Sequence, residues 1–364
     1  MGQQVTPLRV GIVGCGQIAQ QYLDTFARLD TVALVAVADL VPERAAEVAA
    51  RVPGVRALSI DQLLADPEVA LVINLTIPLA HAEVSLRALA AGKEVYTEKP
   101  LTADLASATE VIAAGEAAGL WVGCAPDTVL GTGIQTARKT IDDGLIGRPI
   151  SATATMVTPG HERWHPNPDF YYLPGGGPLL DMGPYYVSAL VQLLGPVTSV
   201  IGSASRLRQE RTIGSGPRAG ETVPVEIDTH VTGVLTHASG ALSTLVMSFD
   251  AVATHAANIE VHGERGSLAV PDPNHFDGEV RLRALGADGW EVQPVSAGYR
   301  AAGRGVGVHD RALSADRAHA RASGALGFHA LEVMQAVLRS AREGRAIPIE
   351  STCERPAPVP LSGL

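Results

Sequence analysis

A glycine-rich segment near the N-terminus has the spacing of a phosphate-binding turn. Gly14, Gly16 and Ala19 form the pattern G-x-G-x-x-A directly after an apolar run. The first glycine permits a tight turn, the second lets a pyrophosphate approach the backbone, and a small third residue lets a helix pack closely on the strand. The N–H groups and positive dipole end of that helix would face the phosphates. The residues expected at this dinucleotide site are Gly14, Gly16, Gln17 and Ile18.

An acidic residue stands where the ribose of such a cofactor would bind. Asp39 ends the second apolar run, twenty residues after Ala19, where a carboxylate can accept both ribose hydroxyls. The next residue is Leu40, not Arg or Lys, so a 2′-phosphate would meet an uncompensated carboxylate. The pattern therefore favours NAD. NADP stays open, because Arg44 is near in the sequence and can offset the repulsion.

Lysine is rare in this chain, which makes its placement informative. The sequence has 25 arginines and three lysines, so a site that needs only positive charge is usually given Arg. Lys99 stands between a predicted strand end and Pro100, which suggests chemistry that uses a compact ammonium of adjustable pKa. We predict that Lys99 is catalytic and that Glu98 and Lys99 also contact the cofactor. A surface lysine at a turn is the alternative.

Asp181 and Tyr185 are four residues apart in a predicted helix, so both project from one face. Pro184 between them is tolerated only near a helix start. If the expected dinucleotide transfers hydride to or from a hydroxyl-bearing carbon, a group must take or supply the hydroxyl proton, and a phenol is a poor base at neutral pH. A nearby ammonium such as Lys99 would stabilise the phenolate. Direct donation by Lys99, a capping role for Asp181 and a merely packed Tyr185 stay open.

Four further cofactor contacts are expected where the predicted strand 70–75 ends. This is the carboxyl edge of the sheet, where cofactors bind in open parallel sheets. For His81, capping of its own helix is an equal alternative. The residues are Asn74, Thr76, Pro78 and His81.

The segment 161–165, His-Glu-Arg-Trp-His, satisfies the zinc-binding pattern H-E-x-x-H. That pattern binds zinc only on a helix, and here Pro159-Gly160 precede it while Pro166 forces His165 toward an extended conformation. We therefore predict no metal site. A substrate-facing loop is the more useful hypothesis, and a purely structural loop is its alternative. The candidate substrate contacts are Trp164, His165 and Tyr186.

The periodicity of the chain predicts two kinds of sheet. Short apolar runs alternate with helical patterns at 79–91 and 103–118, which predicts βαβ units and a doubly wound parallel sheet of the Rossmann type over residues 1–125. The predicted strands are 8–13, 33–38, 70–75, 94–97 and 120–124.

Residues 126–364 are predicted to form an α+β domain with a large, mostly antiparallel sheet. Longer alternating runs occur at 150–157, 225–236, 241–250 and 256–262, with helices at 134–142, 179–194 and 328–342. Segments 206–220 and 297–325 are predicted as loops, and the proline-rich tail 348–364 is expected to pack back along the surface, on the first domain.

Composition excludes several classes of function. A net charge of −10 leaves no basic surface for nucleic acid. Three cysteines without a C-x-x-C pair favour a reducing compartment. With neither a secretory leader nor a long apolar stretch, we expect a soluble cytoplasmic protein without a membrane partner. Gly2 and Thr6 match an N-myristoylation pattern, but no second lipid signal follows and we do not predict lipidation.

One predicted strand has two partly apolar faces. Leu245, Met247 and Phe249 alternate with Thr244, Val246 and Ser248. A sheet with helices on one side only would leave the second face to be buried against another subunit. We expect a homodimer or homotetramer.

Taken together, four motifs resemble the glucose–fructose oxidoreductase/inositol dehydrogenase (Gfo/Idh/MocA) family. The resemblance covers the Rossmann half and the first helix of the second domain. The motifs are Gly14-Cys15-Gly16, residues 76–81, Gly92-Lys93 with Glu98-Lys99-Pro100-Leu101, and residues 175–183.

The resemblance implies an NAD(P)-dependent oxidoreductase that acts on a carbinol carbon of a sugar, sugar derivative or cyclitol, with an open-faced sheet in its second domain. In that family the lysine of the Glu-Lys-Pro motif and an Asp-x-x-x-His pair carry the proton chemistry. Lys99 and Asp181 match, but Tyr185 stands at the histidine position, as in glucose–fructose oxidoreductase. A redox glycosidase that retains its nucleotide and a non-catalytic sugar or nucleotide sensor are the alternatives, and the retained Lys99 favours an enzyme.

Overall fold

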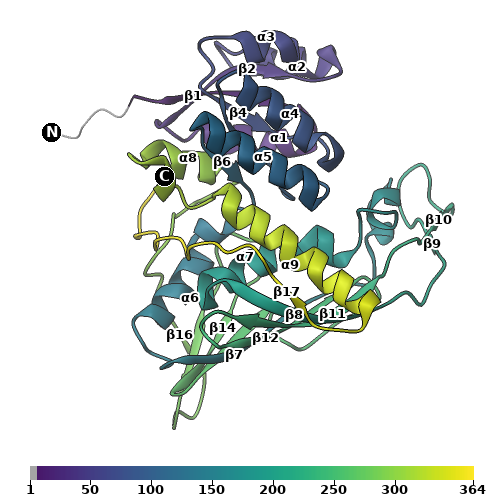
Figure 1. Cartoon of the computed structure of the whole chain (residues 1–364), viewed down its shortest axis with the longest axis vertical. Coiled ribbons are helices and arrows are strands. Elements are labelled where there is room, and N and C mark those ends of the chain that lie inside the picture. Colours follow the sequence, from purple (N-terminus) through teal and green to yellow (C-terminus); the bar gives the residue numbers. More distant parts are fainter. Residues whose placement is uncertain (1–5) are drawn as a thin grey trace. The chain divides into compact units, whose positions relative to one another are not determined.

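The computed structural model describes residues 6–364, so the lipidation pattern at Gly2 lies outside the described residues. The chain divides into two compact units (Figure 1). The first contains the described residues up to Gly131 together with Tyr299–Leu331 and Val359–Leu364. The second contains Thr132–Gly298 and Glu332–Pro358. The domain limits 1–125 and 126–364 stay a prediction, and the structure groups two later segments with the first unit.

The sheet of the first unit is parallel throughout, with the strand order β3-β2-β1-β4-β5-β6. The predicted doubly wound Rossmann sheet is thereby confirmed. All carboxyl ends of its strands lie at one edge, with the end of β1 between those of β2 and β4. The strands are β1 (Leu8–Val13), β2 (Val32–Ala38), β3 (Arg56–Ala57), β4 (Leu71–Asn74), β5 (Glu94–Thr97) and β6 (Val122–Cys124).

The helices that connect these strands have recognisable ends. Ser59 and Gln62 form a capping box at the start of one, and Asp104 caps another, which ends at the left-handed Gly119. The strands between them are buried on both faces, as a parallel sheet covered by helices requires. The helices are α1 (Gln17–Phe26), α2 (Pro42–Arg51), α3 (Ile60–Ala65), α4 (Pro78–Ala90) and α5 (Leu105–Ala118).

Segment 297–325, predicted as a loop, contains helix α8 (Val306–Leu313), so that prediction was wrong. Two buried charges tie this helix to the first unit. The Asp127 carboxylate accepts hydrogen bonds from the backbone N–H groups of Gly305 and Gly307, and Arg311 pairs with Glu94 at 2.7 Å. The helix is stabilised by partners that are distant in the sequence, Asp127 and Glu94. The periodicity of a short segment gives no information about such partners, which is why the sequence did not predict the helix.

The second unit is built on a nine-stranded sheet with the order β16-β15-β14-β13-β7-β12-β11-β8-β17. The pairing is antiparallel except between β7 and β12, which confirms the mostly antiparallel prediction. The strands are β7 (Pro149–Val157), β8 (Val197–Ser205), β11 (His230–His237), β12 (Leu242–Ser248), β13 (Ile259–Gly263), β14 (Gly266–Val270), β15 (Arg281–Ala284), β16 (Glu291–Val292) and β17 (Ile347–Pro348).

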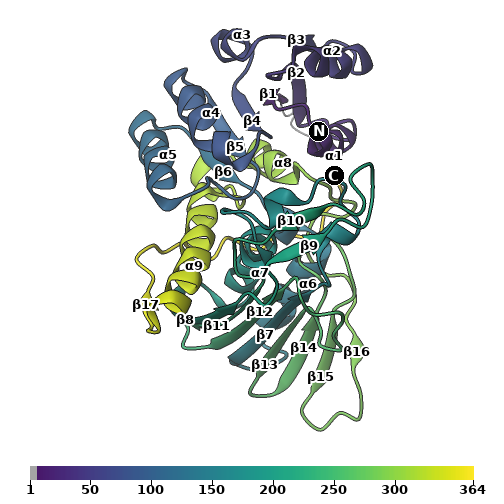
Figure 2. The same ribbon diagram turned by 90° about the vertical axis from the view of Figure 1, so that its right-hand side faces the viewer.

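Helices cover one face of this sheet. Figure 2 shows α7 (Pro178–Leu194) lying along it, and α6 (Thr132–Asp142) packs on β14. Helix α9 (Gly324–Glu343) begins in the first unit, and its later turns approach β8 very closely. A Cβ at Gly202 would lie 2.3 Å from the Val337 carbonyl oxygen, so glycine is needed there.

Two other predictions for this unit need correction. Segment 206–220 was expected to be a loop but contains β9 (Glu210–Thr212), which pairs with β10 (Thr222–Pro224). The apolar run 225–236 was expected to be one strand, yet β11 begins only at His230. Within the described residues, no helix is both long and apolar enough to cross a membrane.

Candidate active site

The turn after β1 has the geometry of a phosphate cradle. Gly14 has a φ of +102°, and a Cβ there would come within 2.7 Å of the Leu75 backbone, so only glycine fits. Gly16 caps α1 in an extended conformation, and the space where its Cβ would stand is open. Ala19 is buried against the sheet. Since the backbone at Gly16 is accessible at a helix N-terminus, the residues present fit a dinucleotide pyrophosphate.

Asp39 lies at the end of β2 and already organises this turn. Its Oδ2 accepts a hydrogen bond from the Cys15 N–H at 2.7 Å, and its Oδ1 accepts one from the Val41 N–H at 2.8 Å. Each carboxylate oxygen has a second lone pair, so the group can still accept from ribose hydroxyls. Burial and the Asp39 charge raise the pKa of the Cys15 thiol to about 11, which fits a small, unreactive turn residue.

The residues after β4 divide into structural and exposed ones. Asn74 is fully buried, and its side chain bonds to the His81 carbonyl, the Ser85 hydroxyl and Thr76. Thr76 and Pro78 are accessible at the edge, whereas the imidazole of His81 is buried between the carbonyls of Pro100 and Thr76. Burial lowers the pKa of His81. Thr76 and Pro78 stay predicted cofactor contacts, whereas the internal bonds of Asn74 and His81 favour a role in holding the turn.

Three large apolar side chains are exposed at the same edge. Leu40 is 87% exposed, Ile77 65% and Leu79 82%. They follow β2 and β4, the strands on either side of the glycine turn. Apolar side chains left in water beside a phosphate cradle are suited to cover the flat rings of a dinucleotide. Sequence reasoning missed Ile77 and Leu79, because an apolar residue beside or in the first turn of a helix gives no sign in the sequence that it is exposed.

Glu98 and Lys99 follow β5 at this edge but differ in exposure. The Glu98 carboxylate is buried and accepts hydrogen bonds from the Tyr22 hydroxyl at 2.8 Å and from the Lys99 N–H at 2.9 Å. Burial and Glu98 together raise the pKa of Tyr22. Lys99 is half-buried. These bonds favour a positioning role for Glu98, whose cofactor contact stays a prediction, and Lys99 keeps its candidate role.

In the second unit, α7 carries the predicted Asp181 and Tyr185. The helix begins at Pro178, so Pro184 lies inside it, in its second turn. Asp181 is half-buried and Tyr185 is buried. Tyr186 was predicted to contact substrate, but it is fully buried, and its hydroxyl is held by Asn258 and Asp272. This bonding argues against its predicted contact with substrate.

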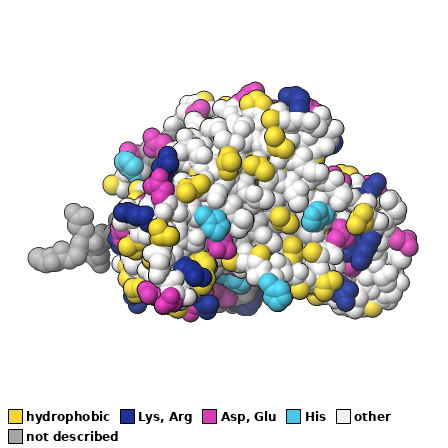
Figure 3. All heavy atoms as spheres, turned by 90° about the horizontal axis from the view of Figure 1, so that it is seen from below, with side chains coloured by type: hydrophobic (Ala, Val, Ile, Leu, Met, Phe, Trp, Pro, Cys, Tyr) yellow, Lys and Arg dark blue, Asp and Glu magenta, His cyan; other side chains and the backbone are white. Residues whose placement is uncertain are grey.

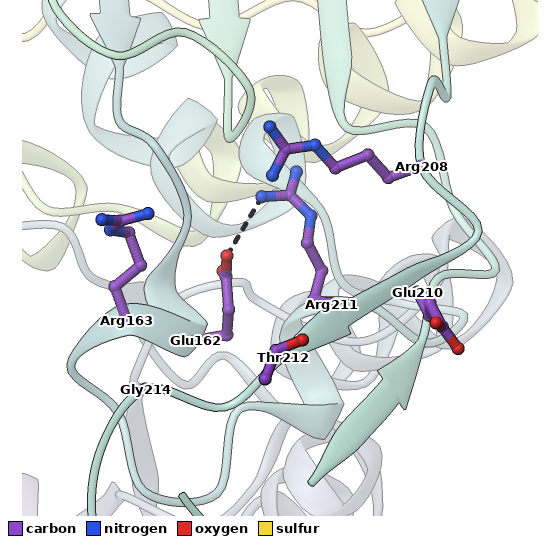
Figure 4. Close-up of a pocket in the computed structure, with 7 residues that line it drawn as sticks. All are labelled: Glu162, Arg163, Arg208, Glu210, Arg211, Thr212 and Gly214. Carbon is purple, nitrogen blue, oxygen red and sulfur yellow. Dashed lines mark hydrogen bonds and ion pairs between the residues drawn. The ribbon is translucent and has the colours of Figure 1, made fainter. Parts of the chain in front are cut away.

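The segment before α7 is anchored by a buried charge network. Arg211 pairs with Glu162 at 3.2 Å and with Asp250 at 2.5 Å, and Glu162 also accepts from the Tyr172 hydroxyl. Figure 4 shows the Glu162–Arg211 pair in the wall of a pocket of about 440 Å³. Removing one partner of such a buried pair typically costs about 3–5 kcal/mol of stability. The network therefore holds residues 159–163 in place.

The two histidines of the H-E-x-x-H segment have different surroundings. The Nε2 atom of His161 lies 3.2 Å from Oδ2 of Asp181, while Nδ1 of His165 accepts the Asn167 N–H. Glu162 is held in the network with Arg211. The segment is a single 3₁₀ turn at His161–Arg163, and no cluster of three metal-ligating side chains occurs in the described part of the chain. Trp164 is 58% exposed and keeps its candidate contact with substrate, as does the half-buried His165.

Two family models match the chain. One, described as "Oxidoreductase family, NAD-binding Rossmann fold", covers residues 8–125, and the other, "GFO/IDH/MocA C-terminal domain", covers residues 134–269. Together they span more than half of the sequence. The chain belongs to the Gfo/Idh/MocA oxidoreductase family. The resemblance predicted from the motifs is confirmed, and the glycine turn after β1 lies in the family's NAD-binding domain.

Other members of the Gfo/Idh/MocA family match over most of their length. A 1,5-anhydro-D-fructose reductase of Ensifer adhaerens is 28% identical over 94% of this chain and 99% of its own. A myo-inositol 2-dehydrogenase of Thermotoga maritima is 27% identical over 72% of this chain and 74% of its own. An NAD-binding oxidoreductase of Klebsiella pneumoniae has a crystal structure with a TM-score of 0.81 and 25% identity, covering 94% and 99% of the two chains.

Proposed function

We propose that this member of the Gfo/Idh/MocA family transfers hydride between NAD and a carbinol carbon of a sugar, sugar derivative or cyclitol. The relatives named above act on a cyclitol and on an anhydro sugar. The observation that carries the proposal for this chain is Lys99, which follows β5 at the same sheet edge as the glycine turn. A sensor that only binds ligand has no need of an ammonium there.

The chain's own residues would handle the proton. NAD, when bound, supplies the hydride acceptor, and oxidation of the carbinol then releases the hydroxyl proton. We assign the transfer of that proton to Lys99 and Tyr185 and the orientation of the hydroxyl to Asp181, a carboxylate that can accept a hydrogen bond from it. In the reductive direction the same groups return a proton to the oxygen.

An absorbance assay of nicotinamide oxidation state tests this function. The protein should be mixed with NAD and a panel of sugars, anhydro sugars and inositols, and with NADH and their keto forms. We expect turnover of at least one compound. Binding of a sugar by calorimetry without turnover of any panel member, in either direction, would instead favour the sensor.

Cofactor preference is expected to depend on Asp39. The unaltered protein should bind NADP more weakly than NAD, because the Asp39 carboxylate repels a 2′-phosphate. Replacing Asp39 with Ala should lower the Kd for NADP relative to the Kd for NAD by about tenfold, equivalent to about 1.4 kcal/mol. Fluorescence titration with both cofactors measures this ratio. Asp39→Asn is the control, since it removes the charge but keeps an acceptor for the turn. Tighter NADP binding by the unaltered protein would contradict the preference.

We also propose a homo-oligomer formed through the face of the nine-stranded sheet that helices leave open. Strand register places Ile201, Val234, Thr244 and Thr153 in one row across β8, β11, β12 and β7. The neighbouring rows hold Ser203, Thr232, Val246 and Thr155, and Ser199, Thr236, Leu242 and Ser151. These three rows lack charged side chains, although charged residues make up 18% of the sequence. Figure 3 shows charged side chains sparse across the middle of this view.

Such a face fits burial against a second copy of the chain. Val234→Arg should therefore lower the mass measured by light scattering to that of a monomer, since two arginines would meet at a symmetric contact. Leu207→Arg, at an 81% exposed position outside the sheet, is the control and should leave the mass unchanged. A monomer mass for the unaltered protein at micromolar concentration would overturn the proposal.

The free cysteines Cys15, Cys124 and Cys353 support the proposal of a cytoplasmic location.

A further inference from the structure

His161 is joined to a residue of the proposed active site that lies twenty positions away in the sequence. Its Nε2 atom is 3.2 Å from the Oδ2 atom of Asp181, and the side chains are 13% and 21% exposed. An imidazole and a carboxylate at this distance share one proton in a charge-assisted hydrogen bond. In such a bond the carboxylate is held in one rotamer.

Aromatic rings also surround the imidazole. Ring centroids of Phe249, Tyr171 and Trp164 lie 4.4, 4.5 and 5.3 Å away. Nδ1 is buried and has no hydrogen-bond partner within the described part of the chain. The arrangement therefore favours the tautomer whose single proton is on Nε2, donated to Asp181.

The backbone that carries His161 is itself fixed. The His161 N–H donates to the Tyr172 hydroxyl at 3.1 Å, and the Glu162 carbonyl accepts the Gly214 N–H at 2.7 Å. The charged side chain bonded to the imidazole is Asp181 on α7, and the next residue in its own turn is Glu162. Glu162 is compensated by Arg211, so Asp181 is the charged group to which His161 responds.

We infer that His161 is the positioning residue of Asp181, donating from Nε2 to hold the carboxylate in the orientation that receives the substrate hydroxyl. This rests on the proposed function, in which Asp181 orients that hydroxyl. It gives the first histidine of the H-E-x-x-H segment a role that needs no metal. It also places an imidazole beside α7 although the helix itself carries Tyr185 at the family's histidine position.

Substitution at position 161 separates the hydrogen bond from the packing. His161→Phe keeps a ring among the aromatic neighbours but removes the donor, and we expect kcat to fall about 10- to 100-fold, the range for losing one hydrogen bond to a charged group. The Kd for NAD should be unchanged. His161→Gln retains an N–H donor and should recover part of the loss. His319→Phe is the control, since His319 also lies near a carboxylate, 3.6 Å from Asp316, but at the surface and outside the proposed site.

Two further measurements distinguish failure of the proposed function from failure of the inference about His161. On an Asp181→Asn background, His161→Phe should add little to the loss, because the two residues act as one unit. In ¹⁵N NMR spectra, the His161 signal can be identified because it is absent from His161→Gln. Its chemical shifts should be those of the Nε2–H tautomer, and Asp181→Asn should change them. Full activity of Asp181→Asn would refute the proposed function of Asp181. The inference about His161 would be refuted in either of two cases. In the first, Asp181→Asn is impaired but His161→Phe is no more impaired than His319→Phe. In the second, Asp181→Asn leaves the His161 signal in place.

Discussion

Replacing Lys99 with Met should lower kcat by about 10²–10⁴-fold, the usual range for a general acid–base contribution. Methionine has a similar length and fills the same half-buried space, but it carries neither charge nor proton. The cradle at Gly14 and Gly16 is formed by backbone, and Glu98 is held by Tyr22, so the Kd for NAD should stay near its original value. Steady-state kinetics and a fluorescence titration of NAD with the same preparation measure both quantities.

Lys139→Met is the control for this substitution. Lys139 is exposed on α6 and pairs with Asp143 at 2.9 Å, so its loss should change kcat little. A loss of NAD binding in Lys99→Met that matches its loss of turnover would show that Lys99 holds the cofactor and does not move the proton.

Replacing Tyr185 with Phe should have an effect of similar size if the phenol carries the proton. Only one oxygen is removed from a buried ring, so the packing of the ring should change little. The kcat for oxidation should fall about 10²–10⁴-fold, while the Kd for NAD should not change. In the double variant with Lys99→Met, the loss should be little greater than in either single variant, because groups that serve one proton transfer are not additive.

Tyr186→Phe offers a matched control on the same helix. Tyr186 is a neighbouring buried tyrosine whose hydroxyl contacts Asn258 and Asp272, and burial together with Asp272 raises its pKa. Its substitution should lower stability by about 1 kcal/mol and leave kcat close to that of the unaltered protein. Nearly full activity of Tyr185→Phe beside an inactive Lys99→Met would make the lysine the proton carrier and Tyr185 part of the wall.

The sequence alone determined the features that depend on local pattern. The alternation of apolar runs and helices predicted the parallel sheet of the first unit, with β1 and β5 at their observed limits. Gly14 and Gly16 were predictable because backbone geometry restricts the residue type at such a turn. Asp39, Lys99 and Asp181 could be chosen because each follows a strand end or lies in a helical motif at a spacing that the chemistry requires.

Only the tertiary structure decided which polar side chains are available. Asn74, Glu98 and Tyr186 have residue types suited to binding, yet their polar atoms are bonded inside the protein. Conversely, the segment 161–165 matched a zinc pattern, and its first histidine proved to be bonded to Asp181. Such contacts join residues that are far apart in the chain, and they form only when folding buries those residues against each other. Sequence spacing reports the local backbone, whereas the partners of a side chain depend on how the whole unit packs.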